Sequence, residues 1–155
     1  MSKIITALLL FPLMNLCALE FQGITIKNQE DFTKAIQGTY SSDLAYGTAH
    51  GEKWSKPALQ FGKDMGLRIR GLTETVLMKG KDFDDPETFI FDKIEGERVY
   101  AHYKLSPAAA GEDPEIPVQI IFSFDGPVLI QKLISDLPPG SKLPREETLY
   151  WRIKK

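Results

Sequence analysis

Two arginines with strand spacing are the first residues that could bind a ligand. Arg68 and Arg70 alternate with Leu67 and Ile69, so on a β-strand both guanidinium groups project from the same face. If that face lines an interior or an interface, the pair could hold a carboxylate through paired hydrogen bonds. If the face meets water, the arginines serve solubility, because antiparallel sheets commonly have one wet face.

Tyr100 and His102 alternate in the same way within residues 88–105, which are typical of a β-hairpin that turns around Gly96. With a three-residue loop, one apolar face pairs Phe89 with Tyr103 and Phe91 with Ala101. The other face then carries Arg98, Tyr100 and His102 together with Ile90, Asp92 and Ile94. We therefore take Arg68, Arg70, Tyr100 and His102 as candidate ligand-binding residues.

Trp54 is the candidate for contact with a protein partner. It lies in the segment Gly51–Pro57, which has few apolar neighbours, and an exposed aromatic side chain in a loop favours an interface. The alternative is that Trp54 covers one open end of the fold.

Catalytic and metal-binding patterns are absent from the sequence. No nucleophile elbow, Ser-x-x-Lys or phosphate-binding glycine loop occurs. His50 and His102, the two histidines, lie in different segments, and the acidic run from Asp82 to Glu87 lacks the spacing of a calcium loop. We expect no enzyme, no cofactor and no metal, although an enzyme of unrecognised type stays open.

The N-terminus has the pattern of a secretory signal peptide. Lys3 precedes an apolar run from Ile4 to Leu16 that is too short to span a membrane, and the small residue Ala18 follows. Cleavage after Ala18 predicts a signal peptide over residues 1–18. Lipidation of Cys17 is the rival, but Leu16 stands where a lipoprotein signal has a small residue.

Residues 19–155 are expected to form a single domain outside the cytoplasm. Cys17 is the only cysteine, so the domain has no disulfide, and no Asn-x-Ser/Thr acceptor site occurs. Both features favour a bacterial periplasm over animal secretion. The net charge is −2, which gives no indication of nucleic-acid binding.

The elements that must position the candidate residues are mostly strands. A short helix is predicted from Asn28, which can cap it, with Phe32, Ala35 and Ile36 on one face. Alternating β-formers broken by glycine and proline then predict an antiparallel meander. The expected strands are 37–42, 58–61, 66–72, 74–79, 88–95, 98–106, 117–124, 128–135 and 147–153.

The helix running into Ile36-Gln37-Gly38-Thr39-Tyr40, and the last strand Leu149-Tyr150-Trp151-Arg152-Ile153, together resemble the lipocalin-like (calycin) barrels. Tyr40 stands where that family has tryptophan. The resemblance implies an up-and-down barrel of about eight to nine strands whose mouth holds a small apolar ligand. It also implies a cation–π contact of Tyr40 with Arg152 at the closed end; the alternative is that Tyr40 is an ordinary core aromatic.

The leading hypothesis is a non-enzymatic periplasmic β-barrel that binds a small apolar or amphipathic ligand. The alternative is a protein-binding inhibitor or immunity-type module that acts on a toxin or envelope enzyme. The first predicts a cavity of several hundred cubic ångströms. The second predicts exposure of Trp54 or of the proline-marked segment Asp136–Glu146.

Overall fold

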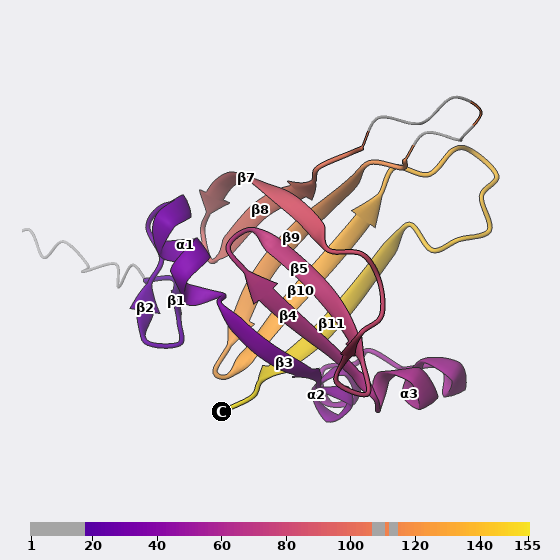
Figure 1. The fold of residues 1–155 in the computed structure, drawn as a ribbon, viewed down its shortest axis with the longest axis horizontal. Coiled ribbons are helices and arrows are strands. Elements are labelled where there is room, and N and C mark those ends of the chain that lie inside the picture. The colour runs from indigo at the N-terminus through magenta and orange to yellow at the C-terminus, as the bar shows by residue number, and fades with distance from the viewer. Residues whose placement is uncertain (1–17, 107–110, 112–114) are drawn as a thin grey trace, which may run out of the picture.

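The computed structural model describes residues 18–106, 111 and 115–155 (Figure 1). The expected signal peptide and Cys17 lie outside the described residues, except for Ala18.

Eight strands pair in a ring and form a closed antiparallel barrel, consistent with a calycin-like fold. In pairing order they are β3 (Gly38–Ser42), β4 (Met65–Arg70), β5 (Thr73–Met78), β7 (Glu87–Glu95), β8 (Arg98–Tyr103), β9 (Val118–Asp125), β10 (Val128–Ser135) and β11 (Glu146–Ile153). The ring closes because β3 pairs with both β4 and β11. The short strand β6 (Lys81–Asp82) pairs with the end of β5, and β1 (Glu20–Phe21) and β2 (Ile24–Thr25) form a separate hairpin.

The mostly β, antiparallel prediction is confirmed, and eight of the nine expected strands lie where they were predicted. The strand expected over residues 58–61 is wrong, because this segment belongs to helix α3 (Lys56–Gly62). The Ser55 side chain accepts a hydrogen bond from the Ala58 amide, and Pro57 lies in the first turn. These are helix-start signals, and they outweigh the β preference of Phe61.

The described residues contain three helices where one was expected, and α2 (Leu44–Ala49) is the other addition. Asp43 caps α2 by accepting a hydrogen bond from the Tyr46 amide at 3.0 Å. The second oxygen of Asp43 binds Arg152, at 2.8 Å from Nε and 2.6 Å from Nη2. The helix is therefore tied to the outer side of β11.

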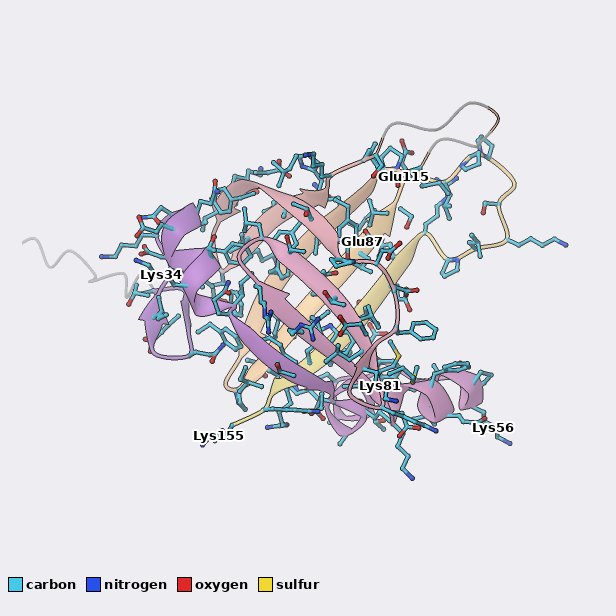
Figure 2. The ribbon with its side chains drawn as sticks, in the orientation of Figure 1. Lys34, Lys56, Lys81, Glu87, Glu115 and Lys155 are labelled. Atoms are coloured by element: carbon cyan, nitrogen blue, oxygen red, sulfur yellow. The ribbon has the colours of Figure 1, made fainter. Side chains whose placement is uncertain are left out.

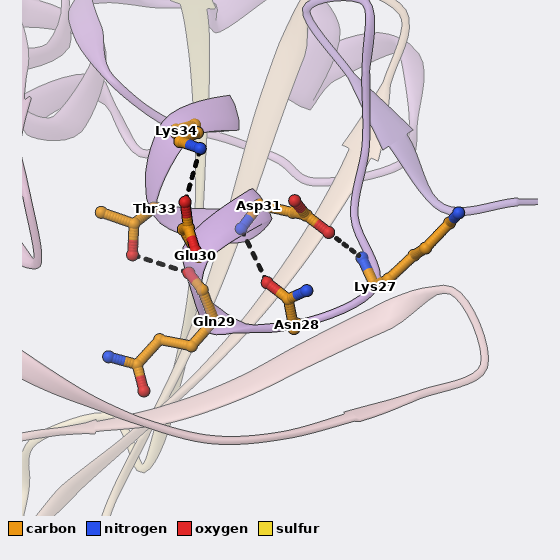
Figure 3. A network of polar contacts seen from close by, with 7 residues as sticks. All are labelled: Lys27, Asn28, Gln29, Glu30, Asp31, Thr33 and Lys34. Carbon is orange, nitrogen blue, oxygen red and sulfur yellow. Dashed lines mark hydrogen bonds and ion pairs between the residues drawn. The ribbon is translucent and has the colours of Figure 1, made fainter.

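Helix α1 (Gln29–Ala35) begins as the sequence predicted. Asn28 accepts a hydrogen bond from the Asp31 amide at 3.0 Å, and Asp31 in turn accepts one from the Lys27 amide at 3.1 Å (Figure 3). The inner face of α1 carries Phe32, which is fully buried against the rings of Phe89, Phe91 and Phe122. The helix thus closes one end of the barrel (Figure 1).

The hairpin of β7 and β8 has the expected register near its open end but not near its turn. Phe89 pairs with Tyr103 and Phe91 with Ala101, as predicted. A bulge between Phe91 and Lys93 then shifts the register, and Ile94 packs against the core instead of sharing the outer face with His102. The bulge arises because Glu95 pairs with Arg98, which leaves a two-residue turn rather than three.

The expected contact of Tyr40 with Arg152 is wrong. Tyr40 is fully buried inside the barrel and donates its hydroxyl hydrogen bond to the Ile36 carbonyl at 2.7 Å. Arg152 pairs with Ser41, the residue that follows Tyr40, and its side chain points outward, where it binds Asp43. Successive residues of a strand face opposite sides of the sheet, so Tyr40, paired with Ile153, cannot meet Arg152. Tyr40 is an ordinary core aromatic.

The barrel has two dissimilar ends. The tight turns at Gly71, Gly96 and Gly126 gather at the end that α1 covers. The longer connections 79–86, 104–117 and 136–145 join strands at the opposite end, which we call the mouth. The connection 43–64 instead carries α2 along the outer side of β11, where the Tyr46 hydroxyl donates to Asp125 Oδ2 at 2.6 Å. Figure 1 shows the loop 136–145, in yellow, extending to the right, away from α1.

Candidate functional site at the barrel mouth

The mouth contains a hollow with a volume of about 850 Å³ between the start of β7 and the loop that follows β8. Leu105, Ile116 and Val118 supply its apolar lining, while Glu87, Lys104 and Glu115 supply charge. Leu105 is 44% exposed and Ile116 is 39% exposed. Figure 2 shows Glu87 and Glu115 at this end of the barrel.

A second hollow of about 560 Å³ lies beside the first, between the ends of β8, β9 and β10. Its lining includes Ile134, Arg145 and His102. Tyr103, Leu105 and Val118 line both hollows, so the two share a wall.

The 850 Å³ hollow exists because the wall of the barrel divides at this end. β5 pairs with β7 only at Thr73–Thr88 and Glu74–Glu87. Beyond Glu74, β5 pairs with β6 instead, and the Phe83 amide donates to the Val76 carbonyl. The start of β7 therefore leaves β5, and residues 85–88 form one side of the hollow.

A chain of four hydrogen-bonded side chains crosses the barrel interior behind Tyr103. The Tyr103 hydroxyl donates to Glu74 Oε1, and Gln131 Nε2 donates to Glu74 Oε2 at 2.7 Å. Trp151 Nε1 donates to Gln131 Oε1 at 2.6 Å. Four strands, β8, β5, β10 and β11, contribute one residue each, so this chain ties opposite walls of the barrel together.

Burial sets the protonation chemistry of this chain. Glu74 is 5% exposed, and loss of hydration raises the pKa of its carboxyl above the ordinary 4.5, although the hydrogen bonds from Tyr103 and Gln131 act in the opposite direction. Burial and the neighbouring Glu74 charge likewise raise the pKa of Tyr103. Tyr103 stands between Glu74 and the hollows, so Glu74 can influence a bound molecule through the Tyr103 hydroxyl.

The pKa of the Glu87 carboxyl, at the entrance, is also raised. Partial burial first, and then the charges of Glu115 and Asp84, raise the pKa of the Glu87 carboxyl. Glu115 Oε2 accepts a hydrogen bond from the Ser106 amide at 2.7 Å, which joins the two ends of the loop after β8. The entrance is thus rich in hydrogen-bond acceptors, with Lys104 as a nearby donor.

The structure places Arg68 and Arg70 on the outside of the barrel. Leu67 and Ile69 are buried inside, and Arg68 donates to Asp82 Oδ2 at 2.7 Å across the outer surface. The two arginines share one face as expected, but that face is not the interior. A ligand role for them stays a prediction, and it would concern the outer wall.

Tyr100 and His102 also face outward, together on β8. His102 Nδ1 lies 2.8 Å from Asp92 Oδ1, and the Lys93 ammonium lies 5.0 Å from the centre of the Tyr100 ring. His102 reaches the edge of the 560 Å³ hollow. Of the four candidate residues it alone lines one of the two mouth hollows, and its role there stays a prediction.

Trp54 is packed rather than exposed. Its ring meets Tyr150 edge-on at 6.4 Å between centroids, and its Nε1 atom is buried without a hydrogen-bond partner. The indole lies over Gly47 of α2, on the outer side of β11, and so it does not cover an open end of the barrel. Within Asp136–Glu146, by contrast, Leu143 is 64% exposed.

Metal binding has no support in the described part of the chain. Within residues 18–106, 111 and 115–155, no group of three or more His, Cys, Asp or Glu side chains could hold a metal ion. His50 instead stacks on Tyr46 with 4.0 Å between ring centres. No helix in these same residues is long and apolar enough to cross a bilayer.

Glu74, Gln131 and Tyr103 are the functional candidates that the strand pattern did not single out. A signal was present, since Glu74 shares its strand face with Val76, and Gln131 shares its face with Leu129 and Leu133. A polar residue among apolar ones on an inward face indicates a buried hydrogen-bonded group.

Comparison of the chain with protein-family models, with curated proteins and with solved structures finds no match. The function must therefore be argued from the mouth itself.

Proposed function

We propose that this chain is an exported, periplasmic, lipocalin-like protein without enzymatic activity, and that it binds a small amphipathic ligand at the barrel mouth. The observation that carries the proposal is the exposure of Leu105 and Ile116 in a hollow of about 850 Å³. Exposed apolar side chains that line a concave surface are typical of ligand sites.

The chemistry of the lining defines the ligand class. Leu105, Ile116 and Val118 offer contact to an apolar chain or ring, while Lys104, Glu87 and the Tyr103 hydroxyl offer hydrogen bonds to a polar head. Because the Tyr103 hydroxyl donates its hydrogen bond to Glu74, its oxygen can still accept a hydrogen bond from a ligand at the mouth. The deep interior is filled by aromatic side chains, so the ligand belongs at the mouth and not at the barrel centre.

The first experiment is native mass spectrometry of the protein purified from its own cell envelope. A bound small-molecule adduct of defined mass is the expected result. A stoichiometric protein partner would contradict the proposal and favour the inhibitor-type alternative, for which the exposed Leu143 and the surrounding proline-marked segment provide the surface.

A matched pair of variants then locates the site. Leu105→Ser removes apolar lining from the mouth, whereas Leu59→Ser removes a similarly exposed leucine, 39% against 44%, from α3. With the fluorescent amphiphile 1-anilinonaphthalene-8-sulfonate as the probe, we expect Leu105→Ser to weaken binding at least roughly threefold, since a lost apolar contact is worth about 1 kcal/mol or more. Equal binding by both variants and wild type would place the probe elsewhere and contradict the mouth as the site.

A further inference from the structure

A separate hollow of about 220 Å³ lies on the outer wall of the barrel, where β3, β4 and β5 run side by side. Three residues that lie side by side on these strands form its floor, since Ser41 of β3 pairs with Gly66 of β4 and Gly66 pairs with Leu77 of β5. Gly66 has no side chain, and a Cβ atom there would stand 2.9 Å from the Tyr40 carbonyl oxygen. The glycine therefore both permits the close approach of β3 and leaves the hollow open.

Three lysines surround this floor. Lys63 follows α3, Lys79 lies in the turn between β5 and β6, and Lys154 follows β11. Asp64 is the only carboxylate in the lining, so the hollow carries a net positive charge on a chain whose net charge is −2. Among the described residues, none of the three ammonium groups lies within 4.0 Å of a carboxylate oxygen.

The backbone holds these lysines in place. The Lys79 amide donates to the Asp64 carbonyl at 2.9 Å, and the Lys154 amide donates to the Thr39 carbonyl at 2.8 Å. Lys79 also adopts φ of +51°, a left-handed conformation that lysine rarely takes and that a two-residue hairpin turn usually gives to asparagine or glycine.

We propose that this outer-wall hollow binds a tetrahedral oxyanion, a phosphate or a phosphate-bearing group. Three ammonium groups and the Ser41 hydroxyl provide donors around the anion, and 220 Å³ exceeds the ~30 Å³ share of one water several-fold. The site shares no lining residue with the mouth and does not depend on the proposed ligand there.

The test is a titration of the full mature chain with inorganic phosphate at constant ionic strength, followed by the amide NMR signals of Gly66, Lys79 and Gly80. We expect saturable shifts at these amides that chloride does not produce. Shifts that chloride reproduces, or no local shift, would overturn the proposal.

Charge variants give the second readout. Lys79→Asn suits the left-handed turn better than lysine, so it keeps the fold while weakening phosphate binding roughly two- to fivefold. The triple variant Lys63→Gln, Lys79→Asn, Lys154→Gln is expected to lose saturable binding, whereas Lys142→Gln, which makes the same charge change on an exposed loop, keeps it. Retention of binding by a folded triple variant would overturn the site.

Vesicles of phosphatidylcholine with and without phosphatidylglycerol distinguish the source of the phosphate group. If the wild type sediments with the anionic vesicles and the triple variant does not, the occupant is a lipid headgroup. Binding of inorganic phosphate without vesicle binding would identify a free phosphate compound. Vesicle binding by wild type and triple variant alike, without the phosphate shifts, would contradict the proposal.

Discussion

At the residue scale, the decisive feature is a carboxyl group inside an apolar barrel. Glu74 accepts two hydrogen bonds, but no basic group pairs with it among the described residues. A buried charge without a counter-ion is costly. Glu74 therefore makes the stability of the barrel depend on pH, and its partner Tyr103 extends that dependence to the mouth.

Glu74→Gln is expected to remove this pH dependence. The folded pKa of Glu74 is raised above 4.5, so the folded state binds the proton more tightly than the unfolded state. The stabilising effect is complete below pH 4.5 and is lost as the pH rises through the folded pKa. The unfolding free energy of the variant, measured in urea, should therefore exceed that of wild type increasingly towards neutral pH, by about 1.4 kcal/mol per unit of pKa difference.

The glutamine is compatible with the existing hydrogen bonds. Its oxygen can accept from Gln131, and its amide can donate to Tyr103, whose hydroxyl hydrogen then turns towards the mouth. Gln60→Glu, a reverse change at an exposed position of α3, serves as the control and should leave the pH profile close to wild type. An unchanged pH profile in Glu74→Gln would show that Glu74 does not titrate in the folded range.

The sequence could predict that the candidate ligand residues share faces, and on β4 it also indicated which face is inside. Arg68 and Arg70 alternate correctly, yet the interior belongs to Leu67 and Ile69. An alternating pattern with apolar residues on one side indicates that this side faces the core. On β5 this rule did not identify Glu74 as an inward residue, because Glu74 and its neighbour Thr75 are both polar and both buried. Burial of Thr75 on the outer face is a tertiary effect that the periodicity of one strand does not contain.

At the element scale, Asp43 contributes both to the start of α2 and to its attachment to β11. Asp43 is buried, caps the helix through the Tyr46 amide and binds Arg152. This double role explains why a six-residue helix, too short to be stable alone, persists on the barrel wall.

Asp43→Ala is expected to destabilise the protein by about 1–2 kcal/mol, because it removes a cap worth about 1 kcal/mol and an ion pair to the half-exposed Arg152 worth up to about 1 kcal/mol. Asp43→Asn keeps an oxygen for the cap and should cost about half as much. Urea unfolding measures both variants. Equal losses in the two would show that the cap contributes nothing and that the ion pair alone matters.

Gly47→Ala tests how α2 positions Trp54. A Cβ atom at residue 47 would stand 2.1 Å from Trp54 Nε1 and 3.1 Å from Tyr150 Cδ2. The indole must leave its place, although alanine favours the helix by about 1 kcal/mol. We expect a red shift of tryptophan fluorescence that is absent in the double variant Gly47→Ala, Trp54→Phe.

Thr48→Ala, on the exposed side of the same helix, should leave the spectrum unchanged. An unshifted spectrum in Gly47→Ala would mean that Trp54 does not rest on the helix. Sequence reasoning missed this packing, because the loop around Trp54 offered no periodic pattern, and the partner Tyr150 is about a hundred residues away along the chain.

At the scale of the whole molecule, the meander was predictable because its hairpins are local. The turn at Asp125-Gly126 between two apolar runs identifies β9 and β10, although their register could not be read from the sequence; the two strands pair over eight residue pairs. Closure of the barrel was expected from the calycin resemblance and is confirmed, but the strand pattern alone does not show it, since it depends on β3 meeting both β4 and β11, across more than a hundred residues. The two shortest contacts between neighbouring strands of the ring are β11–β3, with three residue pairs, and β5–β7, with two.

These unequal seams predict where the barrel opens. Local opening breaks the fewest hydrogen bonds where the contact between two strands is short. Among the barrel strands, amide hydrogen exchange under native conditions should therefore be fastest where β5 meets β7, next to the mouth. It should be slow in β9 and β10. A ligand bound in the 850 Å³ hollow contacts residues 85–88 and should slow exchange at Thr88 and at neighbouring amides of β7. Uniform exchange across all eight strands would mean that the barrel opens as one unit, and the mouth would then have no local flexibility with which to admit a ligand.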